Sequence, residues 1–185
     1  MSRLGKIPIE IPKGVTVEVS ANEVRVSGPK GKLARAIPDG ITVKVDGTRV
    51  LLTRRDDEKN SKSLHGLFRT LLMNMINGVV NGYKKELEIN GVGYKAELKG
   101  KSLIIALGYS HPIEFQVPEG IKVEVEKAVK LTVTGVDKEL VGNISAGLKA
   151  LKVPDPYKHK GVKYFGEVLK KKAGKVIGAT STGAK

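Results

Sequence analysis

Pro38-Asp39-Gly40-Ile41-Thr42-Val43-Lys44-Val45 recurs 80 positions later as Pro118-Glu119-Gly120-Ile121-Lys122-Val123-Glu124-Val125. In both copies Pro, an acidic residue and Gly precede three aliphatic residues that alternate with polar or charged ones. Alternation with a period of two predicts a strand with one buried face, and the Pro and Gly mark the turn before it. The chain is therefore predicted to contain the same strand-rich unit twice.

The same shift of 80 positions aligns the remainder of the two halves without a gap. It places Gly28 over Gly108 and Asp57 over Asp137, so that turn residues and acidic residues coincide as well as aliphatic ones. Chance accounts for matches between aliphatic residues more easily than for matches between Gly and Pro landmarks. The predicted organisation is a first α+β repeat at 1–80, a second α+β repeat at 81–152 and a basic arm and flexible tail at 153–185.

Each repeat ends in a segment with helical periodicity. After Asp57 the apolar residues of the first segment are Leu64, Leu67, Leu71, Leu72, Met75 and Val79. After Asp137 those of the second are Leu140, Ile144, Leu148 and Leu151. A spacing of three and four residues predicts an amphipathic helix, and the acidic residue before it is placed to cap the helix or to precede it. Asn77-Gly78 or Asn81-Gly82 is expected to end the first helix.

A helix with one apolar stripe must bury that stripe, and its own sheet is the nearest cover. Short strands joined by tight turns also favour antiparallel pairing over parallel pairing. The predicted fold class is α+β, with two tandem homologous domains, each an antiparallel sheet with one helix packed on a face, plus a basic C-terminal tail.

The chain is strongly basic, and its charge is unevenly distributed. It has 33 Lys and Arg residues against 19 Asp and Glu residues, which gives a net charge of +14. The last 33 residues hold 8 of the basic side chains and only 2 of the acidic ones, whereas 81–152 is nearly neutral. Such a charge attracts polyanions but does not by itself specify a fold.

In the C-terminal segment, lysines are interleaved with rings, in the order Tyr157-Lys158-His159-Lys160-Gly161-Val162-Lys163-Tyr164. Pro154 and Pro156 exclude a helix and predict a stiff extended arm that leaves the domain. Ammonium groups neutralise phosphates, planar rings stack on unpaired bases, and Gly161 lets the backbone approach a ligand closely. We interpret the arm as RNA-binding. A solvated linker with ordinary lysines is the alternative for such a segment taken in isolation.

This arm resembles the signature of the large ribosomal subunit protein six family in its bacterial form. The matching residues are Pro154, Tyr157, Lys158, Lys160, Gly161, Val162, Lys163 and Tyr164. His159 departs from the pattern, because the family usually has a small residue such as glycine there. The opening Met1–Lys6 and the segment Gly108–Pro112 are also similar to this family, so the likeness runs from end to end.

The resemblance implies a structural constituent of the large ribosomal subunit that binds 23S rRNA near the base of the factor-binding stalk, beside neighbouring ribosomal proteins. The predicted RNA-binding residues are Tyr157, Lys158, His159, Lys160, Gly161, Lys163, Tyr164, Lys170, Lys171 and Lys172. The predicted secondary RNA contacts are Ser2, Arg3, His65, Arg54 and Arg55. Whether Arg54 and Arg55 face RNA or protein is left open, because guanidinium groups bind phosphates and are also enriched at protein interfaces.

The sequence contains no clear motif for catalysis or metal binding. The three histidines are far apart in the sequence and show no metal-ligand spacing. Gly100-Lys101-Ser102 resembles the end of a phosphate-binding loop, but Lys95 stands where that loop requires glycine, and a hairpin turn is the favoured prediction. We predict no enzymatic activity, no metal, no cofactor and no small-molecule substrate.

The absence of cysteine excludes a disulfide framework and thiolate metal sites. No apolar run approaches the roughly 20 residues of a membrane span, and the N-terminus lacks the apolar core of a signal peptide. We therefore expect a cytoplasmic protein with no membrane partner. The alternative functions are a free-standing RNA-binding protein or RNA chaperone, which would not co-sediment with large subunits, and an enzyme with a small-molecule pocket between the domains.

Overall fold

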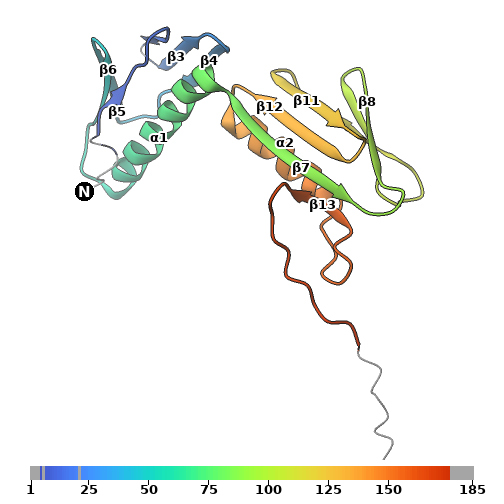
Figure 1. The fold of residues 1–185 in the computed structure, drawn as a ribbon. Coiled ribbons are helices and arrows are strands. Elements are labelled where there is room, and N and C mark those ends of the chain that lie inside the picture. The colour runs from blue at the N-terminus through green and yellow to red at the C-terminus, as the bar shows by residue number, and fades with distance from the viewer. Residues whose placement is uncertain (1–4, 6, 21, 176–185) are drawn as a thin grey trace, which may run out of the picture. The chain divides into compact units, whose positions relative to one another are not determined.

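The computed structural model describes residues 5, 7–20 and 22–175. The first repeat contains short strands followed by one long helix (Figure 1). Its elements are β1 (Ile9–Glu10), β2 (Thr16–Val19), β3 (Glu23–Gly28), β4 (Gly31–Ala36), β5 (Ile41–Asp46), β6 (Arg49–Arg54) and α1 (Lys59–Asn81). They form two three-stranded antiparallel sheets, with the strand orders β1-β6-β5 and β2-β3-β4.

The second repeat follows the same order of strands and then a helix. Its elements are β7 (Tyr83–Asn90), β8 (Lys95–Lys99), β9 (Ser102–Ala106), β10 (Ile113–Gln116), β11 (Ile121–Glu126), β12 (Lys130–Gly135) and α2 (Lys138–Leu151), after which the chain adds β13 (Gly161–Tyr164). One sheet has the order β10-β9-β8 and the other β11-β12-β7-β13. The predicted mixed α+β class, with antiparallel sheets and two helices, is confirmed. The single sheet predicted for each repeat is wrong, because the strands of each repeat pair into two sheets.

The strands that the repeat predicted are present as β5 and β11, and both are preceded by a glycine with positive φ. Gly40 has φ +81° and Gly120 has φ +86°, a backbone conformation that glycine adopts without a steric penalty. The Gly100 turn joins β8 to β9 as the predicted hairpin, with Lys99 opposite Ser102. No helix within the described ranges is long and apolar enough to span a membrane.

By the packing of its residues the described chain divides into two compact units. The first comprises the described residues within Met1–Lys85, Val117–Val123 and Val133–Ile144; the second comprises those within Glu86–Gln116, Glu124–Thr132 and Ser145–Lys185. The four-stranded sheet and α2 thus contribute residues to both units. The predicted boundaries at 80 and 152 stay a prediction.

In the first unit α1 packs against β3, β4, β5 and β6. Its buried face contains His65, Phe68, Arg69, Leu72, Met75, Ile76, Gly78 and Val79. The apolar stripe predicted for this helix is therefore partly wrong: Leu67 is 55% exposed and Leu71 is only half-buried, whereas Leu72 is 1% exposed. Apolar residues occur on more than one side of α1, and contact with the two sheets selects the side that is buried.

The ends of the helices distinguish the two acidic residues that were predicted to cap or to precede them. The Asp137 carboxylate accepts a hydrogen bond from the Glu139 backbone N–H at 2.8 Å, which is the geometry of an N-cap. Asp57 instead pairs with Arg54, and α1 begins after Glu58 without a side-chain cap. The Asn81-Gly82 alternative for the end of α1 is confirmed, because the Gly82 N–H donates to the Gly78 carbonyl.

Candidate nucleic-acid interface

The segment after α2 returns to the second unit as a strand. β13 pairs antiparallel with β7, with Val162 opposite Ile89 and Lys163 opposite Glu88 (Figure 1). Val162 is 1% exposed, and its N–H donates to the Lys152 carbonyl at 2.8 Å. The expectation of an arm that leaves the domain is therefore wrong for residues 161–164. One buried aliphatic residue and a free edge of β7 are enough to bind this segment to the sheet.

Gly161 allows this return of the chain. Its φ is +146°, and a Cβ atom at this position would lie 2.7 Å from the Lys152 carbonyl oxygen and 2.8 Å from the Pro154 backbone. The close approach that the sequence suggested for Gly161 is thus an approach to the protein's own backbone. Its contact with RNA stays a prediction.

The change Gly161→Ala is expected to destabilise the β13 pairing by well over about 1 kcal/mol, because backbone strain and a clash with backbone atoms add together. Hydrogen exchange at the Val162 amide measures the effect. Gly166→Ala is the matched control, since Gly166 has φ +76° but open space around it, so only the strain applies. Equal exchange rates in the two variants would contradict the packing role of Gly161.

Residues 154–160 form a hydrogen-bonded turn between α2 and β13. The Asp155 N–H donates to the Lys160 carbonyl at 3.0 Å, and the Asp155 carbonyl accepts from the His159 N–H at 2.8 Å. The Asp155 carboxylate accepts from the Lys158 N–H at 2.8 Å. His159 has φ +57°, the left-handed conformation that glycine favours. The side chains of Tyr157, Lys158 and Lys160 are exposed on this turn.

A second run of lysines lies beside the turn. The Lys172 N–H donates to the Pro156 carbonyl at 3.0 Å, which joins the chain after β13 to the turn before it. Lys170, Lys171 and Lys172 are exposed, and Tyr157 is 50% exposed. We call the set Tyr157, Lys158, Lys160, Lys170, Lys171 and Lys172 the basic loop surface. It combines five ammonium groups with one accessible ring, which suits contact with phosphates and an unstacked base.

Two predicted RNA-binding residues already have partners within the protein. The Lys163 ammonium lies 3.1 Å from a Glu88 carboxylate oxygen. The Tyr164 N–H donates to the Glu167 carboxylate at 3.0 Å, and the Lys149 ammonium lies 4.8 Å from the centre of the Tyr164 ring. Lys163 and Tyr164 therefore help to hold β13 on the unit. Any role in RNA contact stays a prediction for both.

Glu167 links the end of β13 to α2. Its carboxylate accepts a hydrogen bond of 2.6 Å from Lys149, and this bond, together with the Tyr164 N–H, lowers the pKa of the Glu167 carboxyl. The sequence did not reveal Glu167 and Lys149 as residues that hold the end of β13 to α2. It also did not reveal Asp155 as the residue that closes the turn, although an Asp between two prolines is a common turn signal.

Among the predicted secondary contacts, His65 is placed differently from the expectation. It is 3% exposed on α1, with Nε2 3.1 Å from the Leu52 carbonyl oxygen. A surface position for His65 is therefore wrong, because its ring fills space against Leu52 and Gly5. Ser2 and Arg3 lie outside the described residues.

Arg54 and Arg55 differ from each other. Arg54 is 13% exposed and donates from Nε to the Asp57 carboxylate at 2.9 Å, which lowers the pKa of the Asp57 carboxyl. Arg55 is exposed, while its N–H donates to the Gly40 carbonyl at 2.9 Å. Of this pair, Arg55 is the residue whose side chain is available to a partner.

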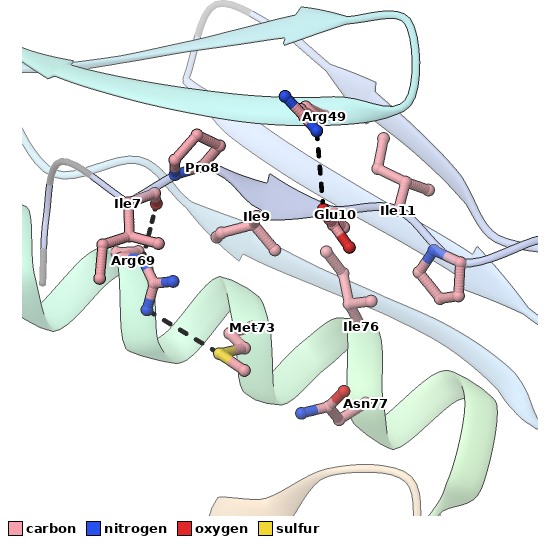
Figure 2. Close-up of a pocket in the computed structure, with 11 residues that line it drawn as sticks. Ile7, Pro8, Ile9, Glu10, Ile11, Arg49, Arg69, Met73, Ile76 and Asn77 are labelled. Carbon is pink, nitrogen blue, oxygen red and sulfur yellow. Dashed lines mark hydrogen bonds and ion pairs between the residues drawn. The ribbon is translucent and has the colours of Figure 1, made fainter.

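The first unit also has a groove between its N-terminal segment and α1, which Figure 2 shows. Arg69, which is 8% exposed, donates from Nε to the Ile7 carbonyl at 2.9 Å and so holds this segment against the helix. At the rim Arg49 lies 3.7 Å from Glu10. The only ionisable residues among the described residues that line the groove are Glu10, Arg49 and Arg69, and each has a partner within the unit. Packing of the N-terminal segment on α1 accounts for their positions.

No cluster of three or more His, Cys, Asp or Glu side chains that could hold a metal ion occurs in residues 5, 7–20 and 22–175. The polar groups of the C-terminal segment instead hold a backbone turn and leave ammonium groups on the surface. This arrangement can attract and orient a polyanion through several phosphate contacts.

The internal repeat is also found when the chain is compared with known protein families. The model of the family described as Ribosomal protein L6 matches the chain twice, over residues 11–88 and 90–165. The second match thus includes the turn and β13. Two matching domains of the same family confirm the predicted repeat.

Curated relatives match over nearly the whole chain. "Large ribosomal subunit protein uL6" of Carboxydothermus hydrogenoformans is 51% identical over 178 residues, which cover 96% of this chain and 98% of that protein. The protein of the same name from Trichlorobacter lovleyi is 53% identical over 175 residues, with coverage of 95% and 98%. That of Syntrophus aciditrophicus is 49% identical over 179 residues, with coverage of 97% and 100%.

Proposed function

The chain belongs to the ribosomal protein L6 family and is therefore a structural constituent of the large ribosomal subunit; from this premise we propose that it binds 23S rRNA through the basic loop surface. Membership of this family also places the protein in the cytoplasmic ribosome. A ribosomal protein needs a surface that recognises folded RNA, and the basic loop surface of the second unit is the candidate.

The observation that carries the proposal is the hydrogen bond between Lys172 N–H and the Pro156 carbonyl. It brings two basic segments, separated in sequence by β13, onto one exposed surface. Each lysine there contributes a phosphate contact that is independent of base sequence. Tyr157 adds a ring that stacks on an unpaired base.

The proposal includes the location that the resemblance implies. The protein would lie near the base of the factor-binding stalk, next to other ribosomal proteins. Arg55 is suited to such a neighbour or to a phosphate, because its guanidinium is exposed. We expect no small-molecule substrate and no membrane partner.

Crosslinking in the assembled large subunit tests this proposal. A photoreactive phenylalanine analogue at Tyr157 is expected to crosslink to 23S rRNA, at nucleotides of the stalk base. The same analogue at Leu98, which is 45% exposed on β8, is the matched control and should give fewer RNA crosslinks. Crosslinks from position 157 to protein alone would contradict RNA binding by the basic loop surface, whereas RNA crosslinks far from the stalk base would contradict only the location.

A further inference from the structure

We infer that Asp155 is a positioning residue that pre-forms the lysine-bearing turn for RNA, an inference that rests on the proposed function. Three hydrogen bonds meet at this residue. Its N–H donates to Lys160, its carbonyl accepts from His159, and its carboxylate accepts from the Lys158 N–H at 2.8 Å. Two of the three partners are the lysines that the turn presents. The backbone of Asp155 closes the turn at Lys160, and its carboxylate fixes the Lys158 N–H.

An acidic residue is otherwise unfavourable on a surface that binds phosphate, because like charges repel. Here the Asp155 carboxylate accepts a hydrogen bond from the Lys158 backbone N–H within the turn, and the residue is half-buried. Pro154 and Pro156 on either side restrict the backbone further, since each proline fixes its own φ and limits the residue before it. The turn therefore combines covalent stiffness with one side-chain bond that only a suitable acceptor at position 155 can make.

The backbone of His159 has a strained conformation, which these hydrogen bonds must maintain. Its φ of +57° is unfavourable for any residue with a side chain, and its Nε2 is buried without a hydrogen-bond partner in the described part of the chain. The ring therefore contributes no hydrogen bond from Nε2 to hold the turn. The Asp155 bonds to His159 and Lys160 lie on both sides of the strained residue and hold it in place. The carboxylate adds a third bond, to the Lys158 N–H just before His159, and without it the two backbone bonds alone must hold the strained residue. The turn then relaxes more easily at His159, and the two lysines lose their common orientation.

A disordered lysine side chain or loop must be ordered when RNA binds, and this ordering reduces affinity without changing the number of phosphate contacts. Asp155→Ala is therefore expected to weaken binding of the full-length chain to purified 23S rRNA by about tenfold, with an unchanged salt dependence. Asp155→Asn is expected to bind within about twofold of the parent, because the amide oxygen of Asn also accepts a hydrogen bond from the Lys158 N–H.

A second substitution shows whether Asp155→Ala weakens binding by loss of positioning, by the change in charge or by unfolding of the second unit. In the variant with both Asp155→Ala and His159→Gly, glycine adopts positive φ without a steric penalty, so most of the lost affinity should return. Hydrogen exchange at the Lys158 amide should be faster in Asp155→Ala than in Asp155→Asn. Rescue by glycine would not occur if Asp155→Ala simply unfolded the second unit.

The outcomes are distinct. If Asp155→Ala and Asp155→Asn both strengthen binding by the same factor, Asp155 acts only through its charge and the inference is wrong. It is also wrong if Asp155→Ala binds like the parent, or if His159→Gly restores nothing. If the parent itself binds 23S rRNA no more tightly than a variant without the lysines of the basic loop surface, the proposed function fails instead.

Discussion

A variant with glutamine at Lys158, Lys160, Lys170, Lys171 and Lys172 is expected to bind 23S rRNA on the order of 10³-fold more weakly than the parent at about 0.1 M salt. Each lysine that contacts a phosphate releases counterions, and at the single-strand coefficient five such contacts contribute roughly 3.5 to the slope of log K against log salt concentration. That slope should fall by the same amount. Equilibrium binding at several salt concentrations measures both quantities.

A charge-matched control variant is available elsewhere on the chain. Lys13, Lys44, Lys99, Lys101 and Lys127 are also exposed, and their replacement by glutamine removes the same net charge. If only the total charge of +14 attracts RNA, the two variants will lose affinity equally, and the basic loop surface will have no special role. A loss confined to the first variant locates the phosphate contacts.

Lys163 provides a finer comparison within the same segment. Its ammonium lies 3.1 Å from Glu88, so part of its charge is already neutralised. A single Lys163→Gln change should therefore lower the salt slope by less than Lys158→Gln does. A larger effect for Lys163 would show that its pairing with Glu88 breaks on RNA binding.

Replacing Leu72 by alanine is expected to reduce the free energy of unfolding by about 2–5 kcal/mol, the usual range for a fully buried leucine. Leu72 is 1% exposed on α1, within the cluster that includes Val24, Val50 and Phe68. The substitution removes apolar contacts and leaves a cavity that the surrounding side chains fill only in part. Urea unfolding of the full-length chain measures the change.

Leu67→Ala is the matched control on the same helix. Leu67 is 55% exposed, so its replacement should change the free energy of unfolding by no more than about 0.5 kcal/mol. Both substitutions make the same chemical change at nearly the same helix propensity cost. Equal destabilisation by the two would mean that the buried face of α1 is assigned incorrectly.

Much of the fold follows from patterns that are local in the sequence. The alternation at 41–45 and 121–125 predicts strands because side chains of a strand point to opposite faces in turn. The glycines at 40 and 120 predict the turns because positive φ is available to glycine at little cost. The repeat itself is visible because both units use these local patterns in one register. None of these predictions depends on which distant residues are in contact.

The buried face of α1 required the tertiary structure. Leu67, Leu71 and Leu72 are equally apolar, and their spacing alone does not say which of them meets the sheets. Packing selected the side with Phe68 and Leu72, and it buried His65 and Arg69 there because each has a backbone carbonyl to bond. A polar residue on a buried face can be recognised only when its partner is known.

The candidate site, like the fold, was determined in part by the sequence alone and in part only by the tertiary structure. The sequence by itself determined which residues carry the positive charge and the rings, and that the segment from Pro154 onward is not a helix. Only the tertiary structure placed residues 161–164 on the edge of β7 and brought Lys172 to Pro156. Those contacts depend on a free strand edge far away in the chain and on one buried valine, neither of which leaves a periodic signal. The physical reason is that backbone hydrogen bonds between distant segments are nearly independent of side-chain identity, so a sequence pattern does not specify them.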